Sequence, residues 1–204
     1  MRNSKIKSMT IDAMFLAILA LMTFIPQIGF ISLGGVISFT LLHIVVLIGA
    51  GLGGTKKGLI YGIMFGCLSL IKAATSGTGI FDPYFVNPLI SILPRAIFGL
   101  IAGLLFDLVN KLNLRTIRVT ATIIISFVTT MLHSLMVLGM LGLFNASELT
   151  EVSQQNYWLV MGGILGSSSI VEAIAASIIV SPVLVALNQK ILNLKKNKNI
   201  KTED

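Results

Sequence analysis

The sequence predicts an all-α integral membrane protein with six transmembrane helices and both termini in the cytoplasm. Only 11% of the 204 residues are charged and the mean hydropathy is +0.94, whereas an ordinary soluble domain carries roughly 25% charged residues. The charges are clustered, which leaves apolar stretches of about 17–25 residues, the length that crosses a bilayer. A soluble enzyme, a nucleic-acid binder and a disordered protein are therefore excluded as function classes.

The first apolar stretch follows Arg2, Lys5 and Lys7, as a signal peptide would, but no small-x-small cleavage site follows it. We therefore interpret it as a retained helix. The predicted helices run over about residues 10–25, 36–54, 58–74, 89–109, 117–144 and 158–187. The last two exceed the ~30 Å hydrocarbon core at 1.5 Å per residue, so we expect them to tilt or protrude. Residues 1–204 form one predicted membrane domain, with 188–204 as a basic cytoplasmic tail.

The basic residues orient the helices. Cytoplasmic segments of membrane proteins are enriched in Lys and Arg, and with the N-terminus inside, the inner segments hold 13 of the 15 basic residues. These are Arg2, Lys5, Lys7, Lys56, Lys57, Lys111, Arg115, Arg118, Lys190, Lys195, Lys196, Lys198 and Lys201. The remaining two, Lys72 and Arg95, fall near the outer side. This placement explains the net charge of +7 without a nucleic-acid partner.

Motifs for catalysis are missing from the sequence. It contains no Walker motif, so the chain cannot hydrolyse ATP by that route. Cys67 is the only cysteine, and Asp12, Asp107 and Glu172 are too scattered for a carboxylate metal site. We therefore expect no metal, no cofactor and no enzymatic activity, with an intramembrane enzyme as the less favoured alternative.

Polar side chains within the apolar segments are the candidate functional residues, because they are costly in lipid and usually line a cavity or face a partner. Arg95 lies about one and a half turns into the fourth predicted helix, and a cation in an apolar cavity is a natural partner for a small carboxylate. Instead of binding a ligand, Lys72 could extend its amine to the membrane–water interface, and each histidine could bond a neighbouring carbonyl. The role of Glu172 stays open. The candidate substrate-binding residues are Gln27, Thr40, His43, Lys72, Asn87, Arg95, His133 and Ser168. They gather in the outer and middle parts of the helices, which predicts an outward-facing pocket rather than a channel.

Small residues at four-residue spacing let helices approach closely. On the third and fourth predicted helices they are Gly58, Gly62, Gly66, Gly99 and Gly103. We expect these glycines to pack helices within the chain. Ala13 and Ala17 form a similar face on the first helix, which could dock a helix of another protein.

Several segments resemble a known family in their order and spacing. They are Ala13-x-x-x-Ala17, Phe24-Ile25-Pro26-Gln27-Ile28-Gly29-Phe30, His43-Ile44-Val45-Val46-Leu47-Ile48-Gly49-Ala50, Lys57-Gly58 with Gly62 and Phe65-Gly66, and Leu93-Pro94-Arg95 with Gly99. Over nearly its whole length the chain resembles the substrate-binding S-components of energy-coupling factor (ECF) vitamin transporters of Gram-positive bacteria. It is most similar to the pantothenate-type subgroup.

This resemblance implies a transport subunit in the cell membrane. It implies an outward-facing vitamin pocket closed by the loop between helices 1 and 2, and association with a transmembrane T-component and two cytoplasmic ATPases. It further implies that the S-component topples in the membrane to carry its pocket inward, and that Ala13 and Ala17 contact the T-component.

The vitamin is predicted from the chemistry of the candidate residues. Pantothenate is small, polar and anionic, and Arg95 with Asn87, Gln27, His43 and His133 could accommodate it. Flat vitamins such as riboflavin, folate or thiamine usually stack on aromatic side chains, and the chain has one Trp and three Tyr. Pantothenate is therefore favoured, and the same fold serving another vitamin, such as folate or riboflavin, or another micronutrient is the alternative.

Overall fold

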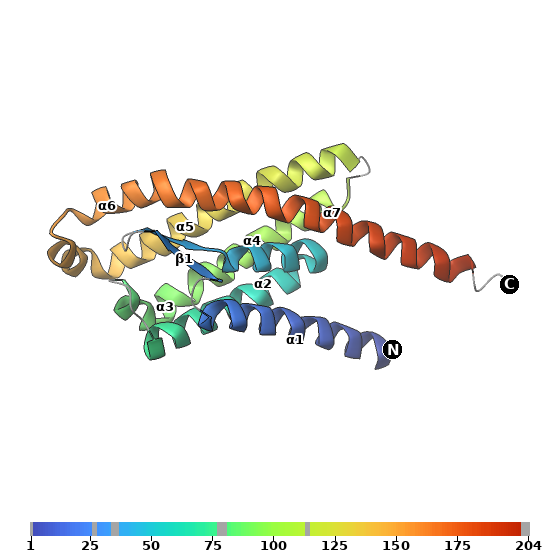
Figure 1. The fold of residues 1–204 in the computed structure, drawn as a ribbon, viewed down its shortest axis with the longest axis horizontal. Coiled ribbons are helices and arrows are strands. Elements are labelled where there is room, and N and C mark those ends of the chain that lie inside the picture. The colour runs from blue at the N-terminus through green and yellow to red at the C-terminus, as the bar shows by residue number, and fades with distance from the viewer. Residues whose placement is uncertain (1, 26–27, 34–36, 77–80, 113–114, 201–204) are drawn as a thin grey trace.

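Five long apolar helices form a bundle (Figure 1). The computed structural model describes residues 2–25, 28–33, 37–76, 81–112 and 115–200. Its elements are α1 (Arg2–Phe24), β1 (Phe30–Leu33), β2 (Ile37–Thr40), α2 (Leu42–Ser76), the 3-10 helix η1 (Asp82–Val86), α3 (Pro88–Ser91), α4 (Leu93–Val109), α5 (Arg115–Ser153), α6 (Tyr157–Ile164), the π-helical turn η2 (Leu165–Ser169) and α7 (Ile170–Ile200). The helices long and apolar enough to cross a membrane are Lys5–Phe24, Leu42–Ser76, Pro88–Val109, Thr116–Glu151 and Tyr157–Leu187.

Helix α2 contains the second and third predicted helices. Gly54 interrupts it with φ +71° and ψ −161°, which is non-helical. A methyl group at Gly58 would lie 3.2 Å from the Cβ of Ala50, although residues eight apart in a straight helix are separated by about 12 Å. The two limbs of α2 therefore fold back on each other at Gly54, as the ribbon shows (Figure 1).

The turn at Gly54 is held by the end of α4. Asp107 accepts hydrogen bonds from the backbone N and Oγ1 of Thr55, at 2.9 and 2.5 Å. The carboxylate thus satisfies a free donor at the start of the second limb, where negative charge is favourable. Asn110 donates to the carbonyl oxygen of Gly51, at 3.3 Å, at the end of the first limb.

The predicted boundaries differ from the structure in several places. Helix α1 begins at Arg2 rather than near residue 10. Residues 37–40 form strand β2, which pairs with β1 in antiparallel register, rather than the start of a helix. The alternation Ile-Ser-Phe-Thr and its β-branched residues favour a strand, which hydropathy alone does not distinguish from a helix. The helical run of α5 passes a break at Asn145 and continues to Ser153, through a segment predicted as an outer loop. Helix α7 continues to Ile200, beyond the predicted end at residue 187.

Glycines bring α2 and α4 into backbone contact, as the four-residue spacing predicted. A methyl group at Gly58 would lie 2.2 Å from the carbonyl oxygen of Gly99, and one at Gly99 would lie 2.1 Å from that of Gly58. At Gly62 it would lie 2.3 Å from the carbonyl oxygen of Arg95. This close packing fixes the helix that carries Arg95 against the second limb of α2.

Replacing Gly58 with alanine is therefore expected to destabilise the protein by about 1–3 kcal/mol, because the added methyl group forces α2 and α4 apart. Thermal unfolding in detergent would measure the effect. Gly162→Ala is the matched control, since nothing lies within 4 Å of the methyl group it would add. Equal melting temperatures for the two variants would contradict the close packing.

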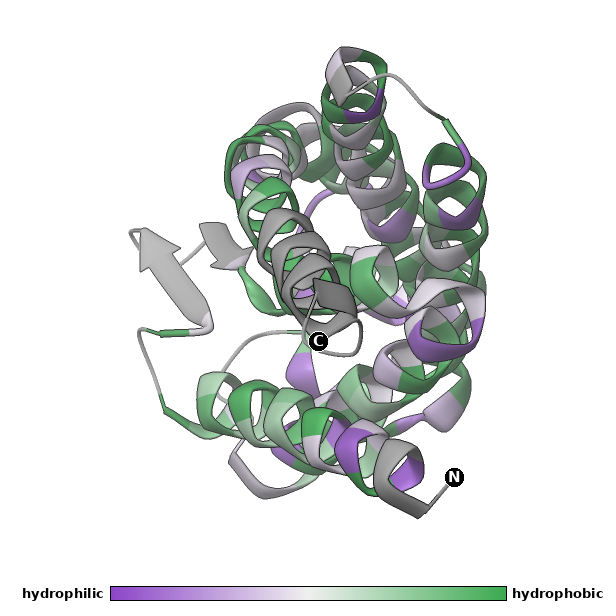
Figure 2. Cartoon of the chain, turned by 90° about the vertical axis from the view of Figure 1, so that its right-hand side faces the viewer, coloured by the Kyte–Doolittle hydropathy of each residue, from purple (hydrophilic) through white to green (hydrophobic). Residues whose placement is uncertain are grey.

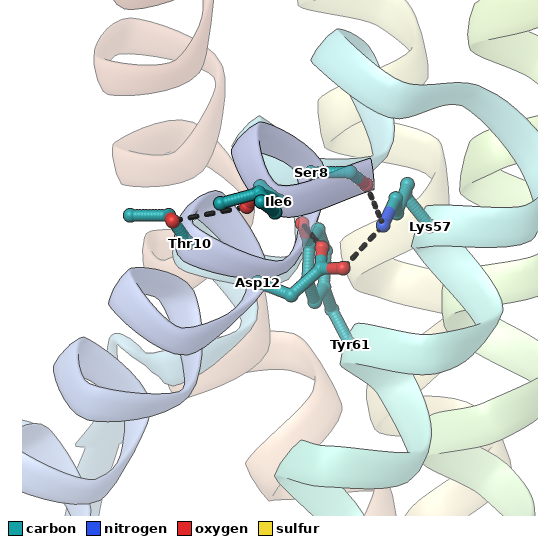
Figure 3. A network of polar contacts seen from close by, with 6 residues as sticks. All are labelled: Ile6, Ser8, Thr10, Asp12, Lys57 and Tyr61. Carbon is teal, nitrogen blue, oxygen red and sulfur yellow. Dashed lines mark hydrogen bonds and ion pairs between the residues drawn. The ribbon is translucent and has the colours of Figure 1, made fainter. Parts of the chain in front are cut away.

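Helix α1 is attached to α2 by a polar network. Lys57 forms an ion pair with Asp12 and donates to Oγ of Ser8 at 2.9 Å, and the hydroxyl of Tyr61 donates to Asp12 at 2.7 Å (Figure 3). Phe15 stacks on Tyr61, with ring centroids 4.6 Å apart. Pairing lowers the cost of placing these charges among apolar helices.

The outer surface of the bundle is apolar. Hydropathy colouring shows hydrophobic residues on every side of the helices (Figure 2). Leu143, Leu159 and Met9 are 75%, 72% and 69% exposed, on helices that meet the length and apolarity needed to cross a membrane. An apolar surface of this kind is compatible with contact to the acyl chains of a lipid bilayer.

Candidate functional site

Buried polar atoms without hydrogen-bond partners mark the candidate site. Within the described part of the chain they belong to two histidines, one arginine and three hydroxyl residues. They are both ring nitrogens of His43 and His133, Nε of Arg95, and the hydroxyls of Ser69, Ser126 and Thr130. An unsatisfied buried polar group costs about 1–3 kcal/mol, and native structures contain few. Six such residues on α2, α4 and α5 indicate a place where a polar ligand or water completes the structure.

Phe65 contacts two members of this group, Arg95 and His133. The guanidinium carbon of Arg95 is 4.9 Å from its ring centroid, and the ring of His133 is 5.8 Å away. His133 in turn lies 4.8 Å from Phe98 and 6.2 Å from His43, measured between ring centroids. The second limb of α2, α4 and α5 therefore bring Arg95 and His133 onto one aromatic platform, and His43 joins them from the first limb.

Arg95 is a buried cation that has no acidic partner among the residues the structure describes. Its side chain is 7% exposed, and Nη1 donates to the carbonyl oxygen of Ser91 at 2.7 Å. The rings of Phe65 and Phe85 flank the guanidinium at 4.9 and 5.3 Å. No carboxylate among the described residues forms an ion pair with Arg95. Because an uncompensated buried charge is costly, this arrangement favours binding of an anion.

Glu172 contacts the end of the β1–β2 hairpin. Its Oε1 accepts from the backbone N and from Oγ1 of Thr40, at 2.5 and 3.0 Å. Glu172 follows the π-helical turn η2, a distortion that is frequent at functional sites. His43 lies three residues after Thr40, and the backbone of Thr40 and Glu172 is close to its ring, although off hydrogen-bond geometry. The carboxylate whose role the sequence left open thus joins α7 to the junction of β2 and α2.

The other predicted site residues have local contacts. Lys72 is half-buried, interacts electrostatically with Asp82, and shares a face of α2 with Phe65. Asn87 caps α3, since its Oδ1 accepts from the backbone N of Leu89 at 3.0 Å. The hydroxyl of Ser168 donates to the carbonyl oxygen of Ile164 at 3.1 Å. Gln27 lies outside the described residues. The roles of all these residues in ligand binding remain predictions.

Several residues in or beside the candidate site were not predicted. Phe65 and Phe98 are ordinary in an apolar helix, so nothing in their local sequence marks them. Ser126 and Thr130 precede His133 by seven and three residues on one face of α5. This spacing could have identified them as neighbours of His133. Among the described residues, no group of three or more His, Cys, Asp or Glu side chains could hold a metal ion.

The chain is similar to known transport proteins. The family model "ECF transporter, substrate-specific component" matches residues 7–184. Pantothenate transporter PanT of Leuconostoc mesenteroides is 36% identical over 110 residues, which cover 52% of this chain and 54% of that protein. Pantothenic acid transporter PanT of Lactococcus lactis subsp. cremoris is 25% identical over 204 residues, which cover 93% of this chain and 97% of that protein. The match thus spans about half the length of the Leuconostoc relative and nearly all of the Lactococcus relative.

Proposed function

This chain belongs to the family of substrate-specific components of ECF transporters, and we propose that it captures pantothenate for uptake into the cell. Family membership makes it a multi-pass membrane protein and a transport subunit rather than an enzyme, with a substrate and an ECF module as partners. The names of the two relatives support pantothenate as the substrate.

The observation that carries this proposal is the buried cation Arg95, which has no acidic partner among the described residues and lies with other buried polar atoms that lack hydrogen-bond partners there. Pantothenate has a carboxylate at one end, an amide in the middle and two hydroxyls at the other end. The carboxylate would neutralise Arg95 through charge-assisted hydrogen bonds. The amide and hydroxyls supply donors and acceptors for the histidines and the buried hydroxyl side chains, which can act as both donors and acceptors.

The proposed topology has six membrane crossings and both termini in the cytoplasm. The turn of α2 at Gly54 supports separate second and third crossings, and the basic residues Lys56 and Lys57 follow this turn directly. The proposed partners are a transmembrane T-component and two cytoplasmic ATPases in a Gram-positive cell membrane. Ala13 and Ala17 would contact the T-component, since both are exposed on α1.

Calorimetric titration of the detergent-purified chain with a vitamin panel tests the substrate. We expect saturable binding of pantothenate and none of riboflavin, folate or thiamine, because Arg95 and the buried polar atoms match the carboxylate, amide and hydroxyls of pantothenate. Tight binding of a different vitamin would replace pantothenate as the substrate. A folded protein that binds no member of the panel would contradict the capture function.

A further inference from the structure

The candidate site has a positive and a negative end. Arg95 supplies the positive end, between the rings of Phe65 and Phe85. Glu172 supplies the negative end, where its carboxylate holds Thr40. Both side chains are buried, with 7% of each residue exposed, so their charges are screened less than surface charges.

Two histidines connect these ends, and their ring nitrogens have no hydrogen-bond partner among the described residues. Phe65 contacts both Arg95 and His133, and His133 lies 6.2 Å from His43. His43 is close to the backbone of Thr40 and Glu172. The contacts therefore run from Arg95 through Phe65 to His133, then to His43 and on to the backbone of Thr40 and Glu172.

We propose that this charge polarity orients the ligand, with its carboxylate at Arg95 and its hydroxyl-bearing end at Glu172 and Thr40. The inference rests on the proposed function, because it takes pantothenate as the ligand. In the opposite orientation, the ligand carboxylate would meet the Glu172 carboxylate in a buried site, where like charges repel strongly. In the proposed orientation, the ligand carboxylate meets the Arg95 cation and a ligand hydroxyl can donate to the Glu172 carboxylate. The central amide of the ligand lies beside the two histidines.

Two ligand analogues probe the two ends separately. Panthenol replaces the carboxylate with an alcohol, and a pantothenate analogue without its terminal hydroxyl removes a donor at the other end. We expect the unaltered chain to bind panthenol at least about 30-fold more weakly than pantothenate, because the pairing of two buried charges is lost. We expect the deoxy analogue to bind about 10- to 100-fold more weakly, as for a hydrogen bond to a charged group.

The variants Arg95→Gln and Glu172→Gln should each abolish one of these preferences. We call the affinity for pantothenate divided by that for panthenol the panthenol ratio, and the affinity for pantothenate divided by that for the deoxy analogue the deoxy ratio. Arg95→Gln should bring the panthenol ratio to within about threefold of one and leave the deoxy ratio unchanged. Glu172→Gln should reduce the deoxy ratio at least about fivefold and leave the panthenol ratio unchanged, while its amide oxygen can still accept from Thr40. Glu151→Gln, at an exposed position on α5, is the control and should change neither ratio. Arg95→Lys and Glu172→Asp replace any glutamine variant that fails to fold, and each should weaken the same ratio partly.

The outcomes separate the orientation from the function. Exchanged effects, in which Glu172→Gln alters the panthenol ratio and Arg95→Gln the deoxy ratio, would overturn the orientation and leave pantothenate as the ligand. An unchanged deoxy ratio in Glu172→Gln would also overturn it. If the folded, unaltered chain binds no pantothenate, the proposed function fails and the orientation fails with it.

Discussion

Arg95→Gln is expected to weaken pantothenate binding by about 30-fold or more. Removing one partner of a buried, hydrogen-bonded charge pair costs about 2–5 kcal/mol, and each 1.4 kcal/mol is a factor of ten. Arg95 is 7% exposed and has no acidic partner among the described residues, so the ligand carboxylate would be its counterion. Calorimetric titration with pantothenate measures the loss, and Lys56→Gln, at an exposed position after the turn of α2, is the control.

The stability of the ligand-free variant distinguishes lost binding from misfolding. Without ligand, the partners of the buried Arg95 charge within the described part of the chain are backbone carbonyls and aromatic rings. Its neutral replacement should therefore leave the melting temperature unchanged or raise it, whereas pantothenate should stabilise the unaltered chain and not the variant. Unchanged pantothenate affinity in Arg95→Gln would remove Arg95 from the binding site.

The long helices were predictable from the sequence because a membrane imposes a simple requirement. A stretch of about 20 apolar residues is long enough to cross the hydrocarbon core, and charges at the ends of the stretches mark their limits. The same reasoning could not detect β2, since Ile37–Thr40 is as apolar as a helix end. It also could not detect that α5 passes Asn145 with only a local break, because polar residues there indicated a loop.

The candidate site was predictable in its polar members and not in their arrangement. His43, Arg95 and His133 are rare residue types within apolar helices, and the structure brings them together. Phe65 and Phe98, which support them, resemble any other core residue. The contact of Glu172 with Thr40 joins residues 132 positions apart, and no local pattern in a single sequence contains that pairing. Single-sequence reasoning therefore finds residues that are unusual for their surroundings, whereas the packing of helices decides which of them meet.

The double variant Ala13→Trp/Ala17→Trp is expected to reduce transport to about one-tenth or less and to leave pantothenate affinity within about twofold, because small residues permit the close helix approach that docking requires. Both alanines are exposed on α1. They lie on the side of α1 away from Asp12 and Leu19, which face the rest of the chain. Two indole groups would thus block a partner helix without entering the core or the candidate site.

Uptake of labelled pantothenate into vesicles that hold the complete transporter measures the first effect, and calorimetry on the isolated chain measures the second. Ile11→Trp/Ile18→Trp is the matched control, since both residues are exposed, at 41% and 43%, on a different flank of α1. If the alanine variant loses binding together with transport, this face of α1 supports the fold of the chain itself. If the isoleucine variant loses transport equally, the whole exposed surface of α1 takes part, and the small side chains of Ala13 and Ala17 have no special role in docking.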